Sequence, residues 1–399
     1  MSRSRARTRE EVIYLDHAAS TPLDVRVSDA MVEAEQAFYA NPHNRSHAPG
    51  RAAAQAVEHA AHKVADALGA APDEILFTSG GTEANNLALL GAARARPERG
   101  HLVTCATEHA SVLEVCRHLA AEEGFLVTVL PVDARGHVEL AALEAALRPN
   151  TLAVSLMWVN NETGALHNVA AIAHLTSARG VLFHCDATQA IGRLPVDMRH
   201  AGVDLLTLSG HKIGGPQGIG ALYVRRGTPL APCFFGGGQQ RGLRPGTLPV
   251  PLVVGLGEAC ELARNDQAVT AAYLSVLTGR LRDGLTKAIP GTEILTSADD
   301  AAPGLLSVAF PDVEAEALLA RVPDLALSSG AACSQGHARI SHVIEALGVP
   351  LELRASVVRF SLGKTTKAIE LTQAIGRLQQ EVAFLRSLTA AAKHPPLFA

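Results

Sequence analysis

The chain has 399 residues, of which 48% are hydrophobic and 19% are charged, and its formal net charge is −4. This length suits a large domain with a smaller one, and the mild negative charge argues against nucleic-acid binding because there is no basic excess to neutralise phosphates. The Arg-rich residues 1–11 lack the apolar run of a signal peptide, and no later run reaches the roughly twenty apolar residues that span a bilayer. We expect a cytoplasmic protein without membrane contact.

Up to about residue 226, apolar runs rich in β-branched side chains alternate with helical patterns. Such alternation predicts a mostly parallel sheet covered by helices on both faces. The strands are expected at 75–78, 101–105, 125–131, 152–159, 181–185 and 203–208, with helices between them at 83–94, 111–121, 140–147 and 169–178.

The pattern changes near residue 265. Long helices are expected over 252–289, followed by shorter strands at 305–310, 325–328 and 357–362 and a final helix at 367–388. We therefore predict an α/β fold whose large domain covers residues 22–267. A smaller α+β domain is predicted to combine residues 1–21 with residues 268–399.

The six cysteines form no Cys-x-x-Cys pair and no cluster along the chain. In a chain of this length, that distribution argues against a disulfide framework and against a structural zinc site. We expect no bound metal, and we expect most of these cysteines to be small buried apolar side chains.

Lysine is scarce in this sequence, which has six lysines. A Schiff base with a carbonyl cofactor requires a lysine, because its amine can become neutral and a guanidinium cannot. Lys212 follows the expected strand at 203–208 and enters a glycine-rich run at 213–220, where the backbone can approach a ligand closely. Taken alone, the pattern also fits a lysine in a hairpin turn that has no role in cofactor binding.

Two further patterns accompany this lysine. Asp186 ends an apolar strand, where a carboxylate needs a partner such as a protonated pyridine nitrogen. The alternative is that the Asp186 side chain caps the turn at 187–191. The run TSGGTE at 78–83 stands before a helix, where backbone N–H groups and Thr82 could face a phosphate, although such turns also cap helices. The order of phosphate turn, acid and lysine, each after a strand, indicates a pyridoxal-phosphate enzyme.

These residues lie within a larger set of motifs. In order they are YLDHAASTP at 14–22, NPHNRSH at 41–47, TSGGTE at 78–83, TEH at 107–109, VNNE at 159–162, DATQ at 186–189, SGHK at 209–212, RPGT at 244–247, SSGAAC at 328–333 and RFSLG at 359–363. Over almost its whole length the chain resembles the cysteine desulfurases of the class V aminotransferase family, of the IscS/NifS type. The resemblance implies pyridoxal 5'-phosphate as cofactor and the fold-type I architecture of pyridoxal-phosphate transferases.

The resemblance also assigns roles to residues around the cofactor. Lys212 would hold it as a Schiff base and carry a proton at the substrate Cα, while Asp186 would bind the pyridine nitrogen and Gln189 the phenolic oxygen. His109 would stack on the ring and take part in acid–base steps, for which an imidazole is suited. The alternative is a structural histidine in the core whose ring nitrogens are hydrogen-bonded. The phosphate would be held by Gly81, Thr82, Ser209, His211 and, from a neighbouring subunit, Thr247.

The shared phosphate site implies a homodimer. On the substrate side, the resemblance implies that Asn161 and Arg359 hold the substrate carboxylate, since a planar guanidinium pairs well with a carboxylate. For Arg359 alone, an ordinary arginine on a surface strand would be the default interpretation.

Cys333 distinguishes the implied chemistry from transamination. Desulfuration needs a thiolate that attacks the substrate sulfur and leaves as a persulfide, and such a residue must travel between the cofactor and a sulfur acceptor. Residues 328–339 are small and glycine-containing without apolar periodicity, so we expect a mobile loop of the long-loop group. The Arg-x-Gly-His-His-Cys pattern of the short-loop type is absent. An incidental loop thiol is the alternative.

The sequence therefore predicts a cytoplasmic homodimeric cysteine desulfurase that converts L-cysteine to L-alanine and leaves sulfur on Cys333. The expected partners are L-cysteine and a protein sulfur acceptor, such as an iron–sulfur cluster scaffold or a thiolation protein. Two alternatives remain open at this point: a selenocysteine lyase or other class V lyase, and a non-catalytic sulfur-carrier or assembly subunit that kept the fold.

Overall fold

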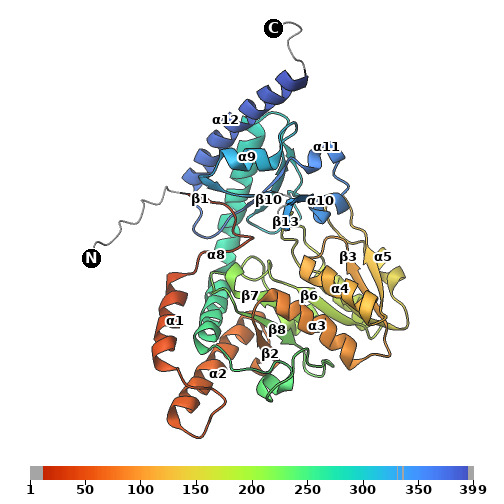
Figure 1. Ribbon diagram of the computed structural model, residues 1–399, viewed down its shortest axis with the longest axis vertical. Coiled ribbons are helices and arrows are strands. Elements are labelled where there is room, and N and C mark those ends of the chain that lie inside the picture. The colour runs from red at the N-terminus through yellow and green to blue at the C-terminus, as the bar shows by residue number, and fades with distance from the viewer. Residues whose placement is uncertain (1–11, 330, 335–336, 394–399) are drawn as a thin grey trace, which may run out of the picture.

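The computed structural model describes residues 12–329, 331–334 and 337–393 (Figure 1). Its largest element is a seven-stranded sheet with the strand order β2-β8-β7-β6-β5-β3-β4. Only β8 runs antiparallel to its neighbours in this sheet, so the expectation of a mostly parallel sheet is confirmed. In chain order its strands are β2 (Ile75–Thr78), β3 (His101–Cys105), β4 (Leu126–Leu130), β5 (Thr151–Ser155), β6 (Leu182–Asp186), β7 (Leu205–Ser209) and β8 (Gly220–Val224).

Helices cover both faces of this sheet, which explains why its inner strands are buried and mainly apolar along their length. On one face, Leu87 and Val112 of the helices pack with Leu152 and Leu205 of the strands. On the other face, helices that precede β2 or follow β5 and β8 complete a second apolar layer. The helices of this half are α1 (Val25–Ala37), α2 (Ala48–Leu68), α3 (Gly81–Ala95), α4 (Ala110–Glu122), α5 (Leu140–Ala146), α6 (Val169–Ser177) and α7 (Met198–Ala201).

A smaller antiparallel sheet with the order β12-β15-β10-β9 forms the other half of the molecule, at the top of Figure 1. Phe310 and Phe360 lie at the centre of its core, together with Leu15 from the N-terminal segment. That segment joins this half through β1, which pairs with β11. The elements are β1 (Ile13–Tyr14), β9 (Glu293–Ile294), β10 (Leu305–Ala309), α9 (Ala315–Arg321), β11 (Leu325–Ala326), β12 (Ser328–Ser329), α10 (His342–Ala346), α11 (Leu351–Arg354), β15 (Val357–Ser361) and α12 (Ala368–Lys393).

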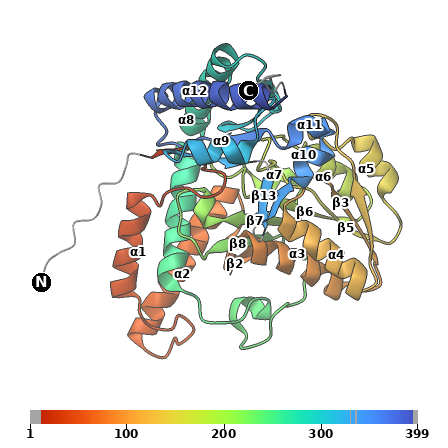
Figure 2. The ribbon, with the colours of Figure 1, turned by 45° about the horizontal axis from the view of Figure 1, so that its top comes forward.

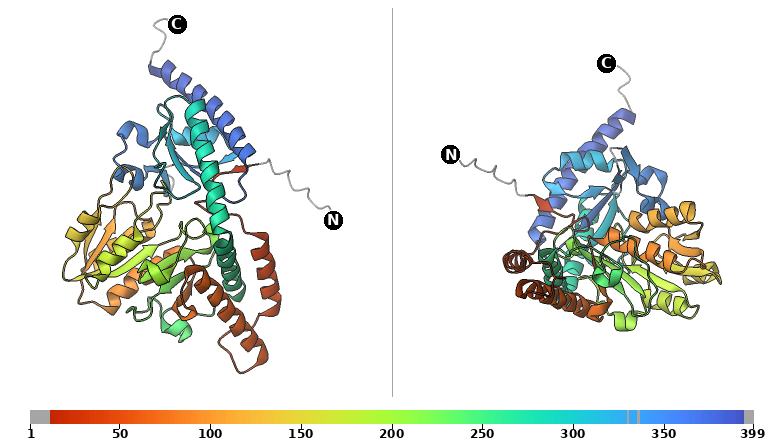
Figure 3. Two further views of the ribbon diagram at one scale, coloured as in Figure 1. Left: turned by 180° about the vertical axis from the view of Figure 1, so that it is seen from behind. Right: turned by 60° about the horizontal axis from the view of Figure 1, so that its bottom comes forward.

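One helix connects the two halves. The sequence predicts several helices over 252–289, but the structure has a single one, α8 (Val250–Ala288), which contacts α1 and α2 in one half and α12 in the other (Figure 3). Its residues Val253 and Cys260 belong to the large core, and Leu274 and Leu281 belong to the small core. We propose that these cores are the two domains and that the predicted division at residue 267 falls inside α8.

The segment that carries Cys333 contains two short strands, β13 (Ala331–Ser334) and β14 (His337–Ile340), which form a hairpin in which Cys333 pairs with Ala338. The expected mobility of this segment stays a prediction. Among the described residues, β13 and β14 pair with each other and with no other strand. Figure 2 shows β13 between the small sheet and the edge of the large one.

A second difference concerns β5. The strand expected at 152–159 ends at Ser155, and the chain then leaves the regular ladder. The amides of Leu156 and Trp158 still donate to the carbonyls of His184 and Asp186 at 3.1 and 2.9 Å. This departure brings the following asparagines and Glu162 toward the end of β6, where the polar side chains of the site lie.

Candidate active site

A cavity of about 430 Å³ lies at the carboxyl ends of the central strands, where an open α/β sheet binds its ligands. It brings together most of the residues that the sequence singles out. Thr247 is exposed and does not line the cavity of its own chain, and the side chain of Cys333 lies outside the described part of the chain. The predicted residues that line it are Gly81, Thr82, His109, Asn161, Asp186, Gln189, Ser209, His211, Lys212 and Arg359.

Lys212 enters the cavity from the short 3₁₀ turn Gly210–Lys212 that follows β7. Its Nζ donates hydrogen bonds to the carbonyls of Ala18 and Ala19, at 2.7 and 2.8 Å. Burial, together with the positive charge of Arg359, lowers the pKa of Lys212 to about 8. A substantial fraction of this amine is therefore neutral near physiological pH, as attack on an aldehyde requires.

Asp186, at the end of β6, is buried and has a partner for each oxygen. Its Oδ1 accepts from the backbone N–H of Thr188 at 3.0 Å, so it does cap the following turn. Its Oδ2 accepts from the side-chain amide of Asn85 at 2.8 Å. The carboxylate also lines the cavity, so capping and ligand binding are compatible functions of one side chain.

His109 caps α4, and this contact fixes its tautomer. The Nδ1 atom accepts from the backbone N–H of Ser111 at 3.1 Å, and an N–H group can only donate. The Ser111 hydroxyl lies 2.8 Å from the same nitrogen and itself accepts from Asn85 at 2.8 Å. Neutral His109 therefore carries its proton on Nε2, and burial lowers its pKa.

Asn85 and Ser111 thus form a buried polar link between His109 and Asp186, and sequence reasoning missed both. Each stands in a helix that begins at a predicted site residue, where a polar side chain is usually solvent-facing. A signal was present for Asn85, because it lies among apolar residues at 84–90, on the side of the helix that must face the sheet.

The N-terminus of α3 forms a cradle for an anion. Thr188 Oγ1 is buried and has no hydrogen-bond partner among the described residues. A side chain at Gly81 would approach that oxygen to 3.3 Å, so glycine keeps the space beside it open. Ser209 and His211 line the same cavity, and burial holds the pKa of His211 at about 4, which leaves its ring neutral. A phosphate group would supply the missing partner of Thr188 and would meet the free N–H groups of the helix.

The motif at 244–247 is anchored to this cradle. Arg244 pairs with Glu83 of α3 at 2.7 Å, and Glu83 in turn accepts from the backbone N–H of Ser79 at 2.7 Å. The neighbouring Gln240 donates to and accepts from the backbone of Phe77, which satisfies the open edge of β2. These contacts fix the segment that presents Thr247 at the surface.

Arg359 reaches the cavity from β15 of the small sheet. Its guanidinium donates to Asp16 at 2.8 Å, to Ser328 at 3.0 Å and to the Asn161 carbonyl at 3.1 Å. Its Nε is buried and has no partner among the described residues. A carboxylate in the cavity could therefore pair with an arginine that is already oriented and still has a free donor.

Both ends of the Cys333 hairpin are fixed at this site. Before the hairpin, Ser328 of β12 pairs in register with Arg359 of β15. After it, Ser341 donates to Glu162 at 2.6 Å, and the His342 ring donates from Nε2 to the Glu108 carbonyl at 2.9 Å. The backbone that carries Cys333 therefore starts and ends beside the cavity.

The described side chains include no group of three or more His, Cys, Asp or Glu that could hold a metal ion. The cavity instead offers an anion cradle, a buried carboxylate, a lysine with a lowered pKa and an oriented arginine, at the open edge of a mostly parallel sheet. This set fits pyridoxal phosphate, with Asp186 toward the pyridine nitrogen and the α3 N-terminus toward the phosphate. The fold and the site together define a fold-type I pyridoxal-phosphate enzyme.

Comparison with known proteins gives the family: residues 13–373 match the family Aminotransferase class-V, and the chain belongs to it. It is 44% identical over 382 residues to "Cysteine desulfurase IscS" of Escherichia coli O139:H28, covering 94% of each chain. A solved structure titled "NIFS-like protein" superposes with a TM-score of 0.88 at 34% identity, covering 94% of this chain and all of that one. A structure titled "SspA in complex with cysteine" has a TM-score of 0.77 at 35% identity, covering 88% of this chain and 98% of the other.

Proposed function

We propose that this chain is a cysteine desulfurase that uses pyridoxal phosphate to convert L-cysteine to L-alanine and transfers the sulfur to Cys333 as a persulfide. The observation that carries the proposal is the register between Ser328 and Arg359. This pairing joins Ser328, which directly precedes the Cys333 hairpin, to the arginine proposed to orient the substrate carboxylate. The relatives named cysteine desulfurase support the same reaction.

The cofactor would be attached to Lys212, with Asp186 at the pyridine nitrogen and Gln189 at the phenolic oxygen. Gln189 donates from Nε2 to the Ala18 carbonyl at 2.9 Å, which orients its amide in the cavity. Gly81, Thr82, Ser209 and His211, with Thr247 of the partner subunit, would hold the phosphate. When bound, the cofactor supplies an electron sink for the charge that develops at the substrate Cα.

The chain's own residues orient the substrate and move protons. Arg359 and Asn161 hold the carboxylate, which sets the direction of the Cα–H bond. Lys212, once released by the substrate amine, removes the Cα proton as a neutral amine and later returns it. His109 presents its Nε2–H as a donor, because Nδ1 is occupied by Ser111.

The sulfur transfer balances without an external oxidant. The Cys333 thiolate attacks the substrate sulfur, so an S–S bond forms on the enzyme while the substrate Cβ–S bond breaks. The electron pair of the broken bond passes to the substrate carbon, which takes up a proton and becomes the methyl group of alanine. A protein acceptor then reduces the persulfide by taking its outer sulfur.

We infer that the enzyme is a homodimer, because Thr247 is exposed at the end of an anchored segment and cannot serve the cavity of its own chain. The acceptor would be an iron–sulfur cluster scaffold or a thiolation protein, in agreement with relatives named IscS. None of the described helices is long and apolar enough to cross a membrane. A cytoplasmic location completes the proposal.

The test is to incubate the purified holoenzyme with L-cysteine and a reductant and to measure sulfide and alanine together. Equal amounts of the two products are expected. Pyruvate with ammonia, or a keto acid derived from the substrate, would contradict desulfuration. A colourless protein with no cofactor absorbance would instead favour a non-catalytic assembly subunit.

Cys333→Ala provides the sharper test, with Cys233→Ala as the matched control because Cys233 is a half-buried thiol away from the cavity. Cys333→Ala should bind cysteine with the same change in cofactor absorbance but release no sulfide. Cys233→Ala should keep full activity. If Cys333→Ala still turned over selenocysteine rapidly while the wild type preferred it to cysteine, a selenocysteine lyase would be the better assignment.

A further inference from the structure

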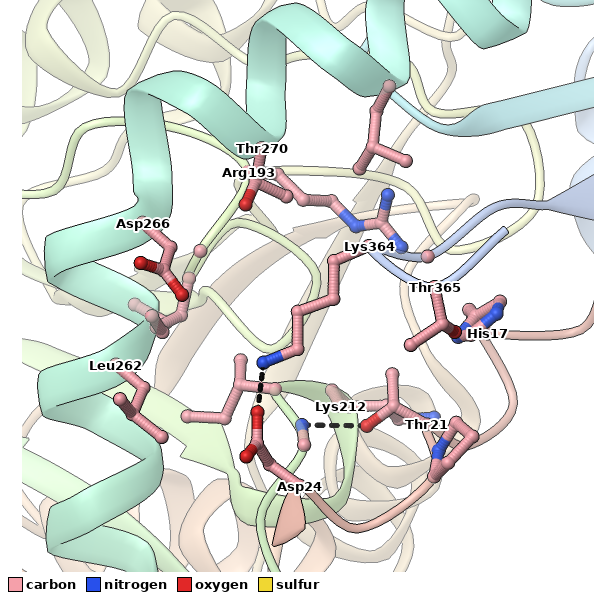
Figure 4. A pocket seen from close by; sticks show the side chains of 18 of the residues that line it. His17, Thr21, Asp24, Arg193, Lys212, Leu262, Asp266, Thr270, Lys364 and Thr365 are labelled. Carbon is pink, nitrogen blue, oxygen red and sulfur yellow. Dashed lines mark hydrogen bonds and ion pairs between the residues drawn. The ribbon is translucent and has the colours of Figure 1, made fainter. Parts of the chain in front are cut away.

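A second cavity, of about 280 Å³, lies between the two cores (Figure 4). Lys212 borders both cavities, but the N-terminal segment separates them: Ala18 and Ala19 line the first, and residues 21–25 line the second. Its other walls are the turn at 191–193, the middle of α8 and the loop at 362–365 that follows β15. Nothing in the proposed desulfurase reaction uses this space.

The walls of this cavity are largely hydrocarbon. Leu262 and Leu274 of α8 face it from one side, and Pro22 and Ile213 face it from the other. Ligand sites usually enclose about 300–1,000 Å³, so this one suits a small molecule with an apolar body.

Arg193 gives the cavity a charge that the protein leaves unpaired. Its side chain lines the cavity and is only 8% exposed. The guanidinium donates to the carbonyls of Pro303 at 2.6 Å and Leu362 at 3.4 Å, and no carboxylate of the described residues forms an ion pair with it. A buried cation without an anionic partner is unfavourable, and burial lowers the pKa of Arg193 to about 10.

The carboxylates at the rim are already occupied. Asp24 accepts from Arg26 at 2.9 Å and also pairs with Lys364, whose side chain runs across the cavity. Asp266 lies 3.7 Å from the same Arg26. Both carboxylates are therefore paired with Arg26 or Lys364, and neither pairs with Arg193. His17 adds no charge, because burial lowers its pKa to about 4, and its Nδ1 has no partner among the described residues.

We propose that this cavity binds a small monocarboxylate with an apolar body, its carboxylate paired with Arg193 and its body between Leu262, Leu274 and Ile213. A carboxylate matches the planar guanidinium and supplies the missing negative charge. Because α8, the N-terminal segment and the loop after β15 all form walls, the bound molecule contacts both cores at once. Binding should therefore stabilise the folded holoenzyme by mass action.

The site is also adjacent to the lysine that holds the cofactor. The Thr21 amide donates to the His211 carbonyl at 2.8 Å, and the Thr21 hydroxyl accepts from the Gly214 amide at 2.7 Å. These bonds make the segment around Lys212 one wall of the second cavity. A molecule bound in the second cavity would restrain the segment around Lys212 from the side opposite the active site, without entering the active site.

Binding is tested on the holoenzyme with hexanoate as the probe and with 1-hexanol and hexylamine as its neutral and cationic analogues. Calorimetry or ligand-observed NMR should show saturable binding of one hexanoate per chain, at least tenfold tighter than either analogue. Ala263→Phe, which fills the cavity, should abolish binding. Ala272→Phe, at an exposed position of the same helix, should leave it unchanged. Failure of hexanoate to saturate, or binding that survives Ala263→Phe, would overturn the proposal.

Two further variants locate the carboxylate. Arg193→Gln keeps amide donors for the two carbonyls but removes the charge, and it should weaken hexanoate binding tenfold or more. Arg193→Lys, which restores a charge, should recover part of the affinity and serves as the test if the glutamine variant does not fold. Arg359→Lys should bind hexanoate as tightly as the wild type. If it instead loses binding, the probe occupies the substrate site and the inference is wrong.

Discussion

Asn85 donates a hydrogen bond of 2.8 Å to Asp186, and this contact joins the helix of the anion cradle to the strand that ends in the buried carboxylate. Both side chains are almost fully buried. The contact holds the Asp186 carboxyl group in one orientation, which a partner of the pyridine nitrogen requires.

Asn85→Leu should weaken cofactor binding. Loss of one buried hydrogen bond to a charged group is worth about 1.5–3 kcal/mol, or roughly tenfold to a hundredfold in affinity. Titration of the apoprotein with pyridoxal phosphate, followed by absorbance, measures this. Because Asn85 also donates to Ser111, urea unfolding of the apoprotein is measured alongside to confirm that the variant is folded. Asn86→Leu is the control, since that amide donates only within its own helix, to the Thr82 carbonyl. Equal affinities for both variants would contradict the prediction.

The attachment of the cofactor to Lys212 should depend on pH with a midpoint near 8. Burial and Arg359 lower the pKa of this amine to about 8, so the neutral, reactive form dominates above that pH and declines tenfold per unit below it. Stopped-flow absorbance of apoprotein mixed with pyridoxal phosphate measures the rate. N-acetyl-lysine, the control amine, should continue to accelerate up to about pH 10. Removal of the neighbouring charge in Arg359→Met should move the midpoint upward. A midpoint near 10 in the wild type would disprove the interpretation.

Arg359→Lys should raise the KM for L-cysteine tenfold or more while leaving the cofactor spectrum unchanged. Lysine keeps the positive charge beside Asp16 but loses the planar fork that pairs with a carboxylate. Steady-state kinetics with sulfide detection gives kcat and KM separately. Arg354→Lys is the matched control, because Arg354 pairs with Glu345 on the same half of the molecule and does not line the cavity. A change confined to kcat would argue that Arg359 does not bind the substrate.

Stability should fall as the pH is lowered from about 6.5 to 4. His17, His167 and His184 are buried, and burial lowers the pKa of each to about 4. Between pH 6.5 and 4 these histidines bind protons in the unfolded chain but stay neutral in the folded chain. The free energy of unfolding therefore decreases by up to about 3 kcal/mol per histidine. Above pH 6.5 both states are neutral and this loss is absent. Urea unfolding at several pH values measures the effect.

His167→Asn isolates one of these groups. The asparagine amide can replace the Nδ1 donor to the Met157 carbonyl, a bond of 2.9 Å, but it cannot be protonated. The variant should therefore lose less stability than the wild type on acidification. His59→Asn, at an exposed position, should keep the wild-type pH dependence. Parallel curves for all three proteins would rule out His167 as a cause of the acid-induced loss of stability.

The large sheet and the cavity at its edge were predictable from the sequence. Strands such as β3 and β7 are buried over their full length, so they appear as mainly apolar runs between amphipathic helices. Asp186 and Lys212 each follow such a run, and parallel topology brings the ends of these strands together. Their shared cavity was therefore a consequence of pattern and topology, whereas their individual roles rested on resemblance.

Other features left no local signal. Asn85 and Ser111 are helix residues whose function depends on which face meets the sheet. α8 buries one set of side chains in the large core and another in the small core, so its apolar face changes along its length and suggests several helices. The pairing of Ser328 with Arg359 links positions 31 residues apart, and nothing in either segment specifies the other.

The continuity of α8 has a consequence for how the molecule can be divided. At 1.5 Å per residue its 39 residues span about 58 Å, without a linker between the part that belongs to one core and the part that belongs to the other. Cutting the chain near residue 267 would break a helix in mid-turn and expose apolar side chains on both fragments. Neither half can be exchanged with a relative as a module, and the two should melt in a single transition.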